Sequence, residues 1–105
     1  MSTETLGEKL RQLRELNELP LRKVAALIDI DVAILSKMER GERKFSKELI
    51  IRLADIYKVK PDELIVDFLS DKVIYELQDE ELGIQALKIA EKELEYLILK
   101  RTQNG

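Results

Sequence analysis

LRKVAALIDIDVAILSKMER, residues 21–40, is the stretch of this chain that decides its fold. Its apolar residues recur at helical spacing, and they are Val24, Ala25, Ile28, Ile30, Leu35 and Met38. Asp31 stands where a second helix needs its N-cap, and Gly41 stands where that helix would end in a left-handed residue. The stretch therefore predicts two short helices joined by a tight turn at Asp29 and Ile30.

The second of these helices, expected over residues 32–39, is aimed outward and is followed by the basic loop Glu42-Arg43-Lys44. A helix fits the width of the major groove of B-DNA, and basic side chains beside it can neutralise phosphates. The two helices and their turn therefore predict a helix-turn-helix motif. Double-stranded DNA is the leading candidate ligand.

Helical patterns extend on both sides of this motif. Thr5 and Glu8 have the spacing of a capping box, and the apolar positions that follow are Leu6, Leu10, Leu13 and Leu16 or Asn17. Ser46 is the expected N-cap of a fourth helix, whose apolar stripe is Leu49, Ile50, Leu53, Ala54 and Tyr57. Pro61 suits the first turn of a fifth helix, whose inward residues are Leu64, Ile65, Phe68 and Leu69. No strand-like alternation persists, so the predicted fold class is all-α.

The pattern changes after about residue 70. The residues that continue the fifth helix, or a short extension of it, are Val73, Ile74 and Leu77. Asp79-Glu80-Glu81 then marks the start of a new helix, which should end near Arg101 and leave a frayed tail. We therefore predict a helix-turn-helix DNA-binding domain over residues 1–69 and a C-terminal helical extension over residues 70–105.

The last helix carries a seam with spacings of three, four and three residues, which is typical of coiled coils. Its members are Leu87, Ala90, Leu94 and Leu97. The seam predicts that the extension dimerises or binds a protein partner. Because the apolar face is broad, the alternative is that this helix packs on the first and fifth helices of its own chain.

Composition excludes several classes of function. The chain contains neither cysteine nor histidine, which removes disulfides, thiol chemistry, zinc-finger ligation and histidine acid–base catalysis. We find no nucleophile–base pair, metal-ligand set or phosphate loop, so we expect no catalytic residues, no metal, no cofactor and no enzyme. The acidic run at residues 79–81 has no second carboxylate cluster, so we interpret it as a helix start rather than as a cation site.

The sequence also lacks the usual signals for a membrane. No apolar run approaches the roughly 20 residues that cross a bilayer. The first residues do not combine a basic segment with a following apolar one, as a signal peptide does. We therefore expect no membrane partner and a cytoplasmic localisation.

The net charge of −3 is distributed unevenly along the chain. Residues 1–60 contain 13 Lys/Arg and 10 Asp/Glu, a net charge of +3. Residues 61–105 contain 5 Lys/Arg and 11 Asp/Glu, a net charge of −6. The front of the chain can therefore face phosphate, whereas the acidic rear should face away from it.

Several segments together match a known family pattern, and they are Leu13-Arg14, Val24-Ala25, Ile28, Ile30, Leu35-Ser36-Lys37-Met38-Glu39-Arg40-Gly41, Leu53-Ala54 and Pro61-Asp62-Glu63-Leu64. The run SKMERGER, residues 36–43, is the strongest part of the match. On these residues, the segment 6–65 resembles the helix-turn-helix domain of the phage-repressor/Cro (XRE-type) transcriptional regulators. The resemblance implies a five-helix repressor-like DNA-binding domain. It also implies a regulator, most often a repressor or autoregulator, that binds an inverted-repeat operator as a homodimer.

Three positions depart from the usual pattern of that family. Pro20-Leu21 stands where Ser-Gln is usual, so a hydroxyl cap and a side chain that often bonds phosphate or base are both lost. Asp29 replaces the turn glycine and adopts positive φ less readily. Residues 32–34, Val-Ala-Ile, stand where polar base-reading residues are common. These departures leave the fold assignment intact and bear on base recognition.

In this motif the N-terminal half of the second helix reaches the base edges. The residues expected to read bases are Asp31, Val32, Ala33, Ser36 and Lys37. Lys37 can donate to guanine, Ser36 can pair with several bases, and the two apolar residues can pack on thymine methyl groups. The alternative is that Val32 is partly core and that Lys37 contacts only phosphate.

Phosphate contacts are expected at the start of the motif's first helix and after its second helix. The residues are Arg22, Lys23, Arg40, Arg43, Lys44 and Lys47. The alternative is that this basic cluster is an ordinary solvated loop. We interpret Glu39 as a structural residue that pairs with Arg14 or Arg43 rather than as a base reader.

Two other functions fit the same residues. An antitoxin would bind its promoter with the front of the chain and cover a protein partner with the acidic, apolar segment 70–101. A controller protein of a restriction–modification operon is also small and has no ligand domain. A neighbouring gene product that co-purifies with the chain would favour the antitoxin.

Overall fold

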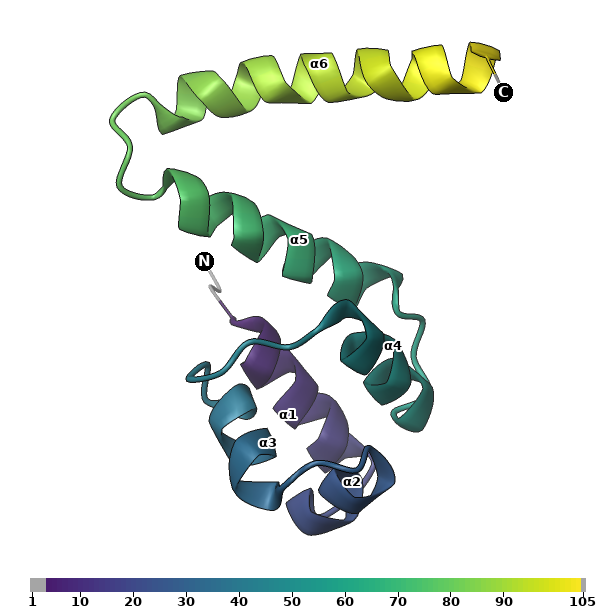
Figure 1. Ribbon diagram of the computed structural model, residues 1–105. Helices are drawn as coiled ribbons and strands as arrows, with labels where there is room; N and C mark the ends of the chain where they lie inside the picture. The colour runs from purple at the N-terminus through teal and green to yellow at the C-terminus, as the bar shows by residue number, and fades with distance from the viewer. Residues whose placement is uncertain (1–3, 105) are drawn as a thin grey trace. The chain divides into compact units, whose positions relative to one another are not determined.

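The computed structural model describes residues 4–104, and every regular element in that range is an α-helix. Figure 1 shows α1 (Leu6–Leu16), α2 (Leu21–Leu27), α3 (Val32–Glu39), α4 (Lys47–Ile56), α5 (Asp62–Leu77) and α6 (Gly83–Asn104). The predicted all-α fold is confirmed. The chain divides into two compact units, one up to Ser70 and one from Asp71, and the division falls within α5.

The first unit is built around one apolar core, in which α3 packs against both α1 and α2. The buried residues are Leu6, Leu10, Val24, Ala25, Ile28, Leu35, Phe45, Leu49, Ile50, Leu53, Ala54, Tyr57 and Leu64. The apolar positions predicted within residues 21–40 are confirmed, because each of them is buried or packs on this core. Phe45, from the loop before α4, joins the core without any helical periodicity to predict it.

The helices α1 to α4 begin where the sequence predicts. Thr5 and Glu8 form the predicted capping box: the Glu8 amide donates to the Thr5 hydroxyl at 3.1 Å, and the Thr5 amide donates to the Glu8 carboxylate at 3.4 Å. Ser46 caps α4 by accepting from the Leu49 amide at 3.2 Å. Pro20 precedes α2 and provides no side-chain cap, so the predicted loss of a hydroxyl cap is confirmed. Side-chain caps thus fix the starts of α1 and α4, which flank the motif.

The helices α1 to α4 all end in the same backbone motif. The residue after each C-cap is left-handed, and these residues are Glu18 (φ 54°), Asp29 (φ 56°), Gly41 (φ 81°) and Lys58 (φ 58°). After α4, the Lys58 amide donates to Asp55 at 3.2 Å and the Val59 amide donates to Ala54 at 3.0 Å, which is a Schellman motif. Only one of the four left-handed residues is glycine, so three of these turns carry a steric cost.

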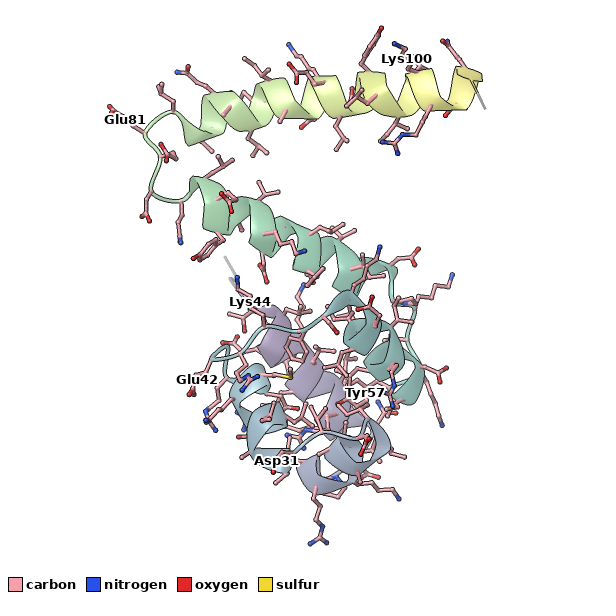
Figure 2. The ribbon with its side chains drawn as sticks, viewed as in Figure 1. Asp31, Glu42, Lys44, Tyr57, Glu81 and Lys100 are labelled. Carbon is pink, nitrogen blue, oxygen red and sulfur yellow. The ribbon has the colours of Figure 1, made fainter. Side chains whose placement is uncertain are left out.

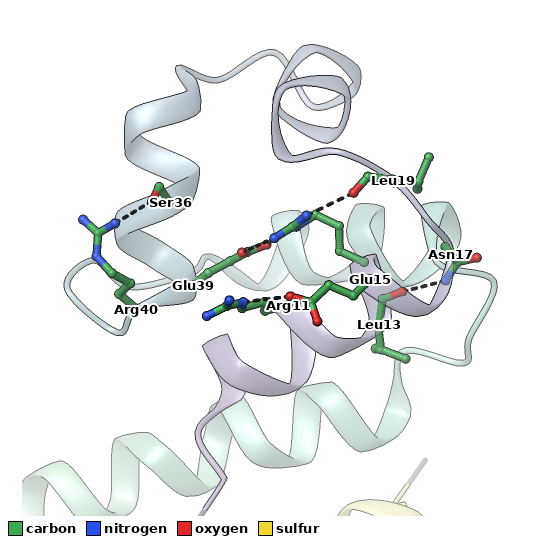
Figure 3. A network of polar contacts seen from close by, with 9 residues as sticks. Arg11, Leu13, Glu15, Asn17, Leu19, Ser36, Glu39 and Arg40 are labelled. Carbon is green, nitrogen blue, oxygen red and sulfur yellow. Dashed lines mark hydrogen bonds and ion pairs between the residues drawn. The ribbon is translucent and has the colours of Figure 1, made fainter.

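A buried ion pair joins α1 to α3. Arg14 donates from Nε to Glu39 Oε2 at 2.8 Å and from Nη2 to Glu39 Oε1 at 3.0 Å. Its Nη1 also donates to the Leu19 carbonyl at 3.0 Å, so that Glu39 and Leu19 lie on opposite sides of the guanidinium (Figure 3). The side chains of Arg14 and Glu39 are only 13% and 6% exposed. The hydrogen bonds to Glu39 raise the pKa of Arg14 above its ordinary value. Of the two partners predicted for Glu39, the structure selects Arg14.

A glycine lets the same two helices approach closely. A Cβ at Gly7 would lie 2.5 Å from the Glu39 carbonyl oxygen and 2.7 Å from that of Met38. Both atoms belong to backbone, which cannot move aside without shifting α3. Gly7 and the Arg14–Glu39 pair therefore fix α3 on α1 at two points, one steric and one electrostatic.

One open alternative is decided and two details of the sequence-based prediction are corrected. Of Leu16 and Asn17, the structure selects Asn17 for the inward position: Leu16 is 78% exposed, whereas Asn17 donates to the carbonyls of Leu13 (2.8 Å) and Tyr57 (3.3 Å). Leu69 is exposed, because the helix has turned it well away from the buried side of α5. The last helix continues past the predicted end to Asn104, so residues 102–104 are helical rather than frayed.

The second unit consists of the end of α5, an acidic turn and α6. Asp79-Glu80-Glu81 lies in the turn that precedes Gly83, rather than within the first turn of the helix. Gly83 is buried, and a Cβ there would lie 2.8 Å from the Leu77 carbonyl oxygen, so the two helical segments meet closely at this turn. None of the helices within residues 4–104 combines the length and apolar character that a membrane crossing requires.

Replacing Lys58 with glycine should stabilise the protein. Glycine adopts the observed φ of 58° without a Cβ clash, so we expect a gain of about 1 kcal/mol. For a unit of this size, that gain raises the thermal midpoint by about 4–8 °C, which circular dichroism can follow. Lys60→Gly is the matched control, since it removes the same charge outside a left-handed turn and should lower the midpoint. Equal changes in both variants would show that Lys58 is not strained.

Replacing Arg14 with alanine should destabilise the protein by about 3–5 kcal/mol, because it leaves the Glu39 carboxylate buried without a partner. Chemical denaturation measures this change. The matched control is Arg11→Ala, which breaks the exposed Arg11–Glu15 pair on the same helix (Figure 3) and should cost about 0.5 kcal/mol or less. Similar costs for the two variants would contradict a structural role for the buried pair.

Candidate nucleic-acid interface

The face of α3 that turns away from the core presents the predicted base-reading residues. Val32 is 43% exposed, and Ala33 and Lys37 are exposed as well. Leu35 and Glu39, on the opposite face of the helix, are buried. The alternative that Val32 is partly core is therefore not supported. The structure brings these predicted residues together on one exposed surface of α3, and their contacts with bases stay a prediction.

Asp31 serves first as the N-cap of α3. Its Oδ1 accepts from the Ala33 amide at 2.8 Å, as the sequence predicts, and Figure 2 shows Asp31 at the start of this helix. The carboxylate is exposed, so Oδ2 remains available as an acceptor for a donor such as cytosine N4. One side chain thus combines a structural role with a position suited to base contact.

A chain of polar contacts runs along the C-terminal end of α3. Arg40 donates from Nη1 to the Ser36 hydroxyl at 2.6 Å (Figure 3). It also donates from Nε to the Glu42 carboxylate at 2.6 Å. Ser36 accepts in this contact and therefore keeps its own hydrogen for a base or phosphate. Arg40 likewise keeps N–H groups beyond these two bonds. The arginine lowers the pKa of Glu42 below its ordinary value, so Glu42 is an anion beside the predicted DNA-facing surface.

Besides Arg40, the predicted phosphate-binding residues come from three parts of the first unit. Arg22 and Lys23 are exposed in the first turn of α2. Arg43 and Lys44 are exposed in the loop after α3, and Lys47 is exposed in the first turn of α4. The sequence order α2–turn–α3–loop–α4 therefore places cations in the elements before and after the exposed helix. That arrangement suits contacts to a phosphate backbone on both sides of a groove.

Two positioning residues were missed from the sequence. Arg52 on α4 donates to the carbonyls of Leu27 at 3.1 Å and Ile28 at 3.4 Å, so it holds the C-terminal end of α2. A basic side chain at a helix C-terminus also opposes the partial negative charge there. No local signal identified Arg52, because its partners lie more than twenty residues earlier in the chain. Gly7 was missed for the same reason.

Besides the Arg14–Glu39 pair, a buried tyrosine has a shifted pKa in the interior beneath this surface. Burial raises the pKa of the Tyr57 phenol above its ordinary range, and the nearby Glu39 acts in the same direction. Tyr57 is the C-cap of α4, where Figure 2 labels it. Within residues 4–104, no three acidic, histidine or cysteine side chains are grouped so that they could hold a metal ion.

Comparison with known proteins agrees with this geometry. Residues 5–65, more than half of the chain, match a family described as "Helix-turn-helix domain". A Bacillus subtilis (strain 168) protein named "Uncharacterized HTH-type transcriptional regulator YazB" is 34% identical over 64 residues, which cover 61% of this chain and 93% of the relative. No solved structure matches the chain. The family match runs from the N-cap of α1 into α5 and leaves the second unit outside it.

Replacing Glu42 with glutamine should strengthen binding to duplex DNA of random sequence by a few-fold at low salt. The change releases Arg40 from its ion pair and removes a negative charge beside the predicted phosphate contacts. Fluorescence anisotropy on a random duplex measures the effect, which should fade as salt rises. The control is Glu15→Gln, which neutralises the acid of another exposed Arg–Glu pair. If both variants gain equally, net charge alone explains the change.

Proposed function

Because the chain belongs to the helix-turn-helix domain family, we propose that it is a sequence-specific DNA-binding transcriptional regulator. The observation that carries the proposal is that α3 packs on α1 and α2 with one face and leaves the other face exposed. The elements before and after α3 present cations beside that exposed face. The name of the Bacillus subtilis relative, an HTH-type transcriptional regulator, supports the same function. The XRE-type subfamily is part of this proposal and rests on the SKMERGER run at residues 36–43.

In the proposed complex, α3 lies in the major groove and its N-terminal half reads base edges. Lys37 donates to guanine, Ser36 pairs through its hydroxyl, and the apolar start of the helix packs on thymine methyl groups. This apolar start, Val32 and Ala33, favours sites that contain A·T pairs at the matching positions. The rigid attachment of α3 to α1 stabilises the recognition helix before DNA arrives, so little ordering is needed on binding.

Positioning on the duplex comes from the basic residues that border α3. The proposed phosphate contacts are Arg22, Lys23, Arg40, Arg43, Lys44 and Lys47. These contacts carry no sequence information and give the binding its dependence on salt. They also account for DNA binding by a chain whose overall charge is negative, because the excess of acids lies in residues 61–105.

A single α3 spans only about half of a typical operator, so we propose that the chain acts as a homodimer on an inverted repeat. Occupation of a promoter by such a dimer makes repression, or regulation of its own gene, the expected outcome. The seam residues Leu87, Leu94 and Leu97 are exposed within their unit, which leaves them available to a second chain.

The same exposed apolar surface favours one alternative, an antitoxin whose second unit covers a protein partner. The two functions differ in what the purified chain does alone. A regulator forms a dimer by itself and binds its operator tightly. An antitoxin forms a complex with the protein that a neighbouring gene encodes. Co-expression with that neighbour, followed by measurement of complex mass, separates them.

Selection of bound sites from a pool of random duplexes tests the proposed function. A reproducible inverted-repeat sequence is the expected outcome. Recovery of sequences without any common motif, with binding that simply follows salt concentration, would contradict sequence-specific regulation.

On the selected site, Lys37→Ala should weaken binding by about 5- to 100-fold and leave binding to random duplexes nearly unchanged, because it removes a base contact. Arg43→Ala should weaken both by the same factor and reduce the slope of log affinity against log salt by about 1, because it removes a phosphate contact. Gel-shift titrations over a salt series measure both effects. Equal behaviour of the two variants would refute the division between base reading and phosphate binding.

A further inference from the structure

The last helix buries almost nothing within its own unit. Gly83 is its buried residue among residues 83–103, and its exposed large apolar side chains are Ile84, Leu87, Ile89, Leu94, Tyr96, Leu97, Ile98 and Leu99. An isolated helix of this length is only marginally stable in water, and most helices depend on packing of an apolar face. The apolar side chains of α6 therefore need a cover that the second unit does not itself supply.

One face of α6 gathers most of this apolar surface. The seam residues are joined on it by neighbours one turn away, and together they are Ile84, Leu87, Ala90, Leu94, Leu97 and Ile98. Ala90, in the middle of the seam, allows another helix to approach closely.

The two ends of α6 carry opposite charges. Asp79-Glu80-Glu81 lies in the turn before the helix, and Lys100 and Arg101 lie near its other end. Figure 2 shows Glu81 and Lys100 at the opposite ends of α6. The 22-residue helix separates these clusters by about 30 Å, so one helix cannot pair its own ends.

We propose that a second copy of this chain covers α6 by packing its own α6 against it in antiparallel orientation. In an antiparallel two-fold pair, residue i of one copy faces residue j of the other and j faces i, so the acidic end of each helix meets the basic end of the other. A parallel pair would instead place three carboxylates against three carboxylates. In the antiparallel pair, the positive end of each helix dipole also lies beside the negative end of the other, which is favourable. The proposal specifies the interface of the homodimer proposed above.

The spacing of the seam sets the register of this pair. Leu87 of one copy lies level with Leu97 of the other, and Ala90 lies level with Leu94, so that each layer joins an a position to a d position. The same register brings Lys100 level with Ile84, within one turn of the acidic residues that precede α6. Apolar layers and end charges are therefore satisfied by one arrangement.

Cross-linking tests the orientation, and it is unambiguous because the native chain contains no cysteine. Glu81→Cys and Lys100→Cys are prepared as separate full-length variants, one of them tagged, and treated with a short bismaleimide alone or as a mixture. We expect covalent dimers in the mixture, each with one copy of both variants, and none in either variant alone. Cross-linked dimers of Glu81→Cys alone would establish a parallel pair and overturn the proposal.

Charge exchange tests the end contacts by light scattering. The double variant Lys100→Glu/Arg101→Glu should shift dissociation of the dimer to at least tenfold higher concentration. Adding Glu80→Lys/Glu81→Lys to the same chain should restore it, because the ends are again complementary. The matched control, Lys88→Glu/Lys92→Glu, makes the same charge change in the middle of α6 and should leave the dimer nearly unaffected. Equal loss in the control would overturn the end-to-end contact.

The experiments distinguish failure of the antiparallel α6 pair from failure of the proposed DNA-binding function. A chain that stays monomeric and uncross-linked at high concentration, yet binds its selected DNA site, would overturn the second copy and leave DNA regulation standing. That outcome would assign the cover of α6 to the first unit of the same chain or to a different protein. A cross-linked dimer that binds no DNA would instead support the antiparallel pair and contradict the regulator.

Discussion

The buried ion pair between Arg14 and Glu39 is the interaction on which the rest of the first unit depends. Short helices, α1 to α4 having at most eleven residues each, enclose a small core together with the start of α5, so apolar burial alone leaves little excess over conformational entropy. The planar guanidinium of Arg14, on α1, makes three hydrogen bonds, two to Glu39 on α3 and one to the Leu19 carbonyl. Gly7 permits the short separation that this pair requires. The orientation of the exposed face of α3 follows from these contacts.

A second constraint is that the chain must reverse direction within a few residues after each of the helices α1 to α4. Helices α1 to α4 end in Schellman motifs, and each places its next residue in the left-handed region. The following residues Leu19, Ile30 and Val59 pack on the core, so the strained turn returns an apolar side chain to the interior. Asp29 belongs to this set, and its positive φ shows that replacement of glycine has not changed the turn. The chain therefore tolerates the steric cost of these left-handed residues because the turns they form return an apolar side chain to the core.

Basic and acidic residues are distributed unevenly along the chain. Cations lie in the elements on either side of α3, while acids accumulate around α5 and before α6. Glu42 is an exception, since it lies beside Arg40 and moderates the basic loop. A chain with an overall negative charge can in this way present a basic surface for the proposed contact with DNA. The exposed α6 then needs a cover whose charges are complementary to its two ends.

The sequence by itself determined the helices of the first unit, the caps of α1, α3 and α4, and the helix-turn-helix, because periodicity and the caps Thr5, Asp31 and Ser46 act over three or four residues. It also predicted which residues of α3 would share the exposed face. Only the tertiary structure decided that Glu39 pairs with Arg14 rather than Arg43, and that Gly7 contacts α3. These choices depend on distances between helices far apart in sequence, which local spacing does not encode. The residues that position α3 could therefore be predicted only in part from the sequence, whereas the residues of its exposed face could be predicted.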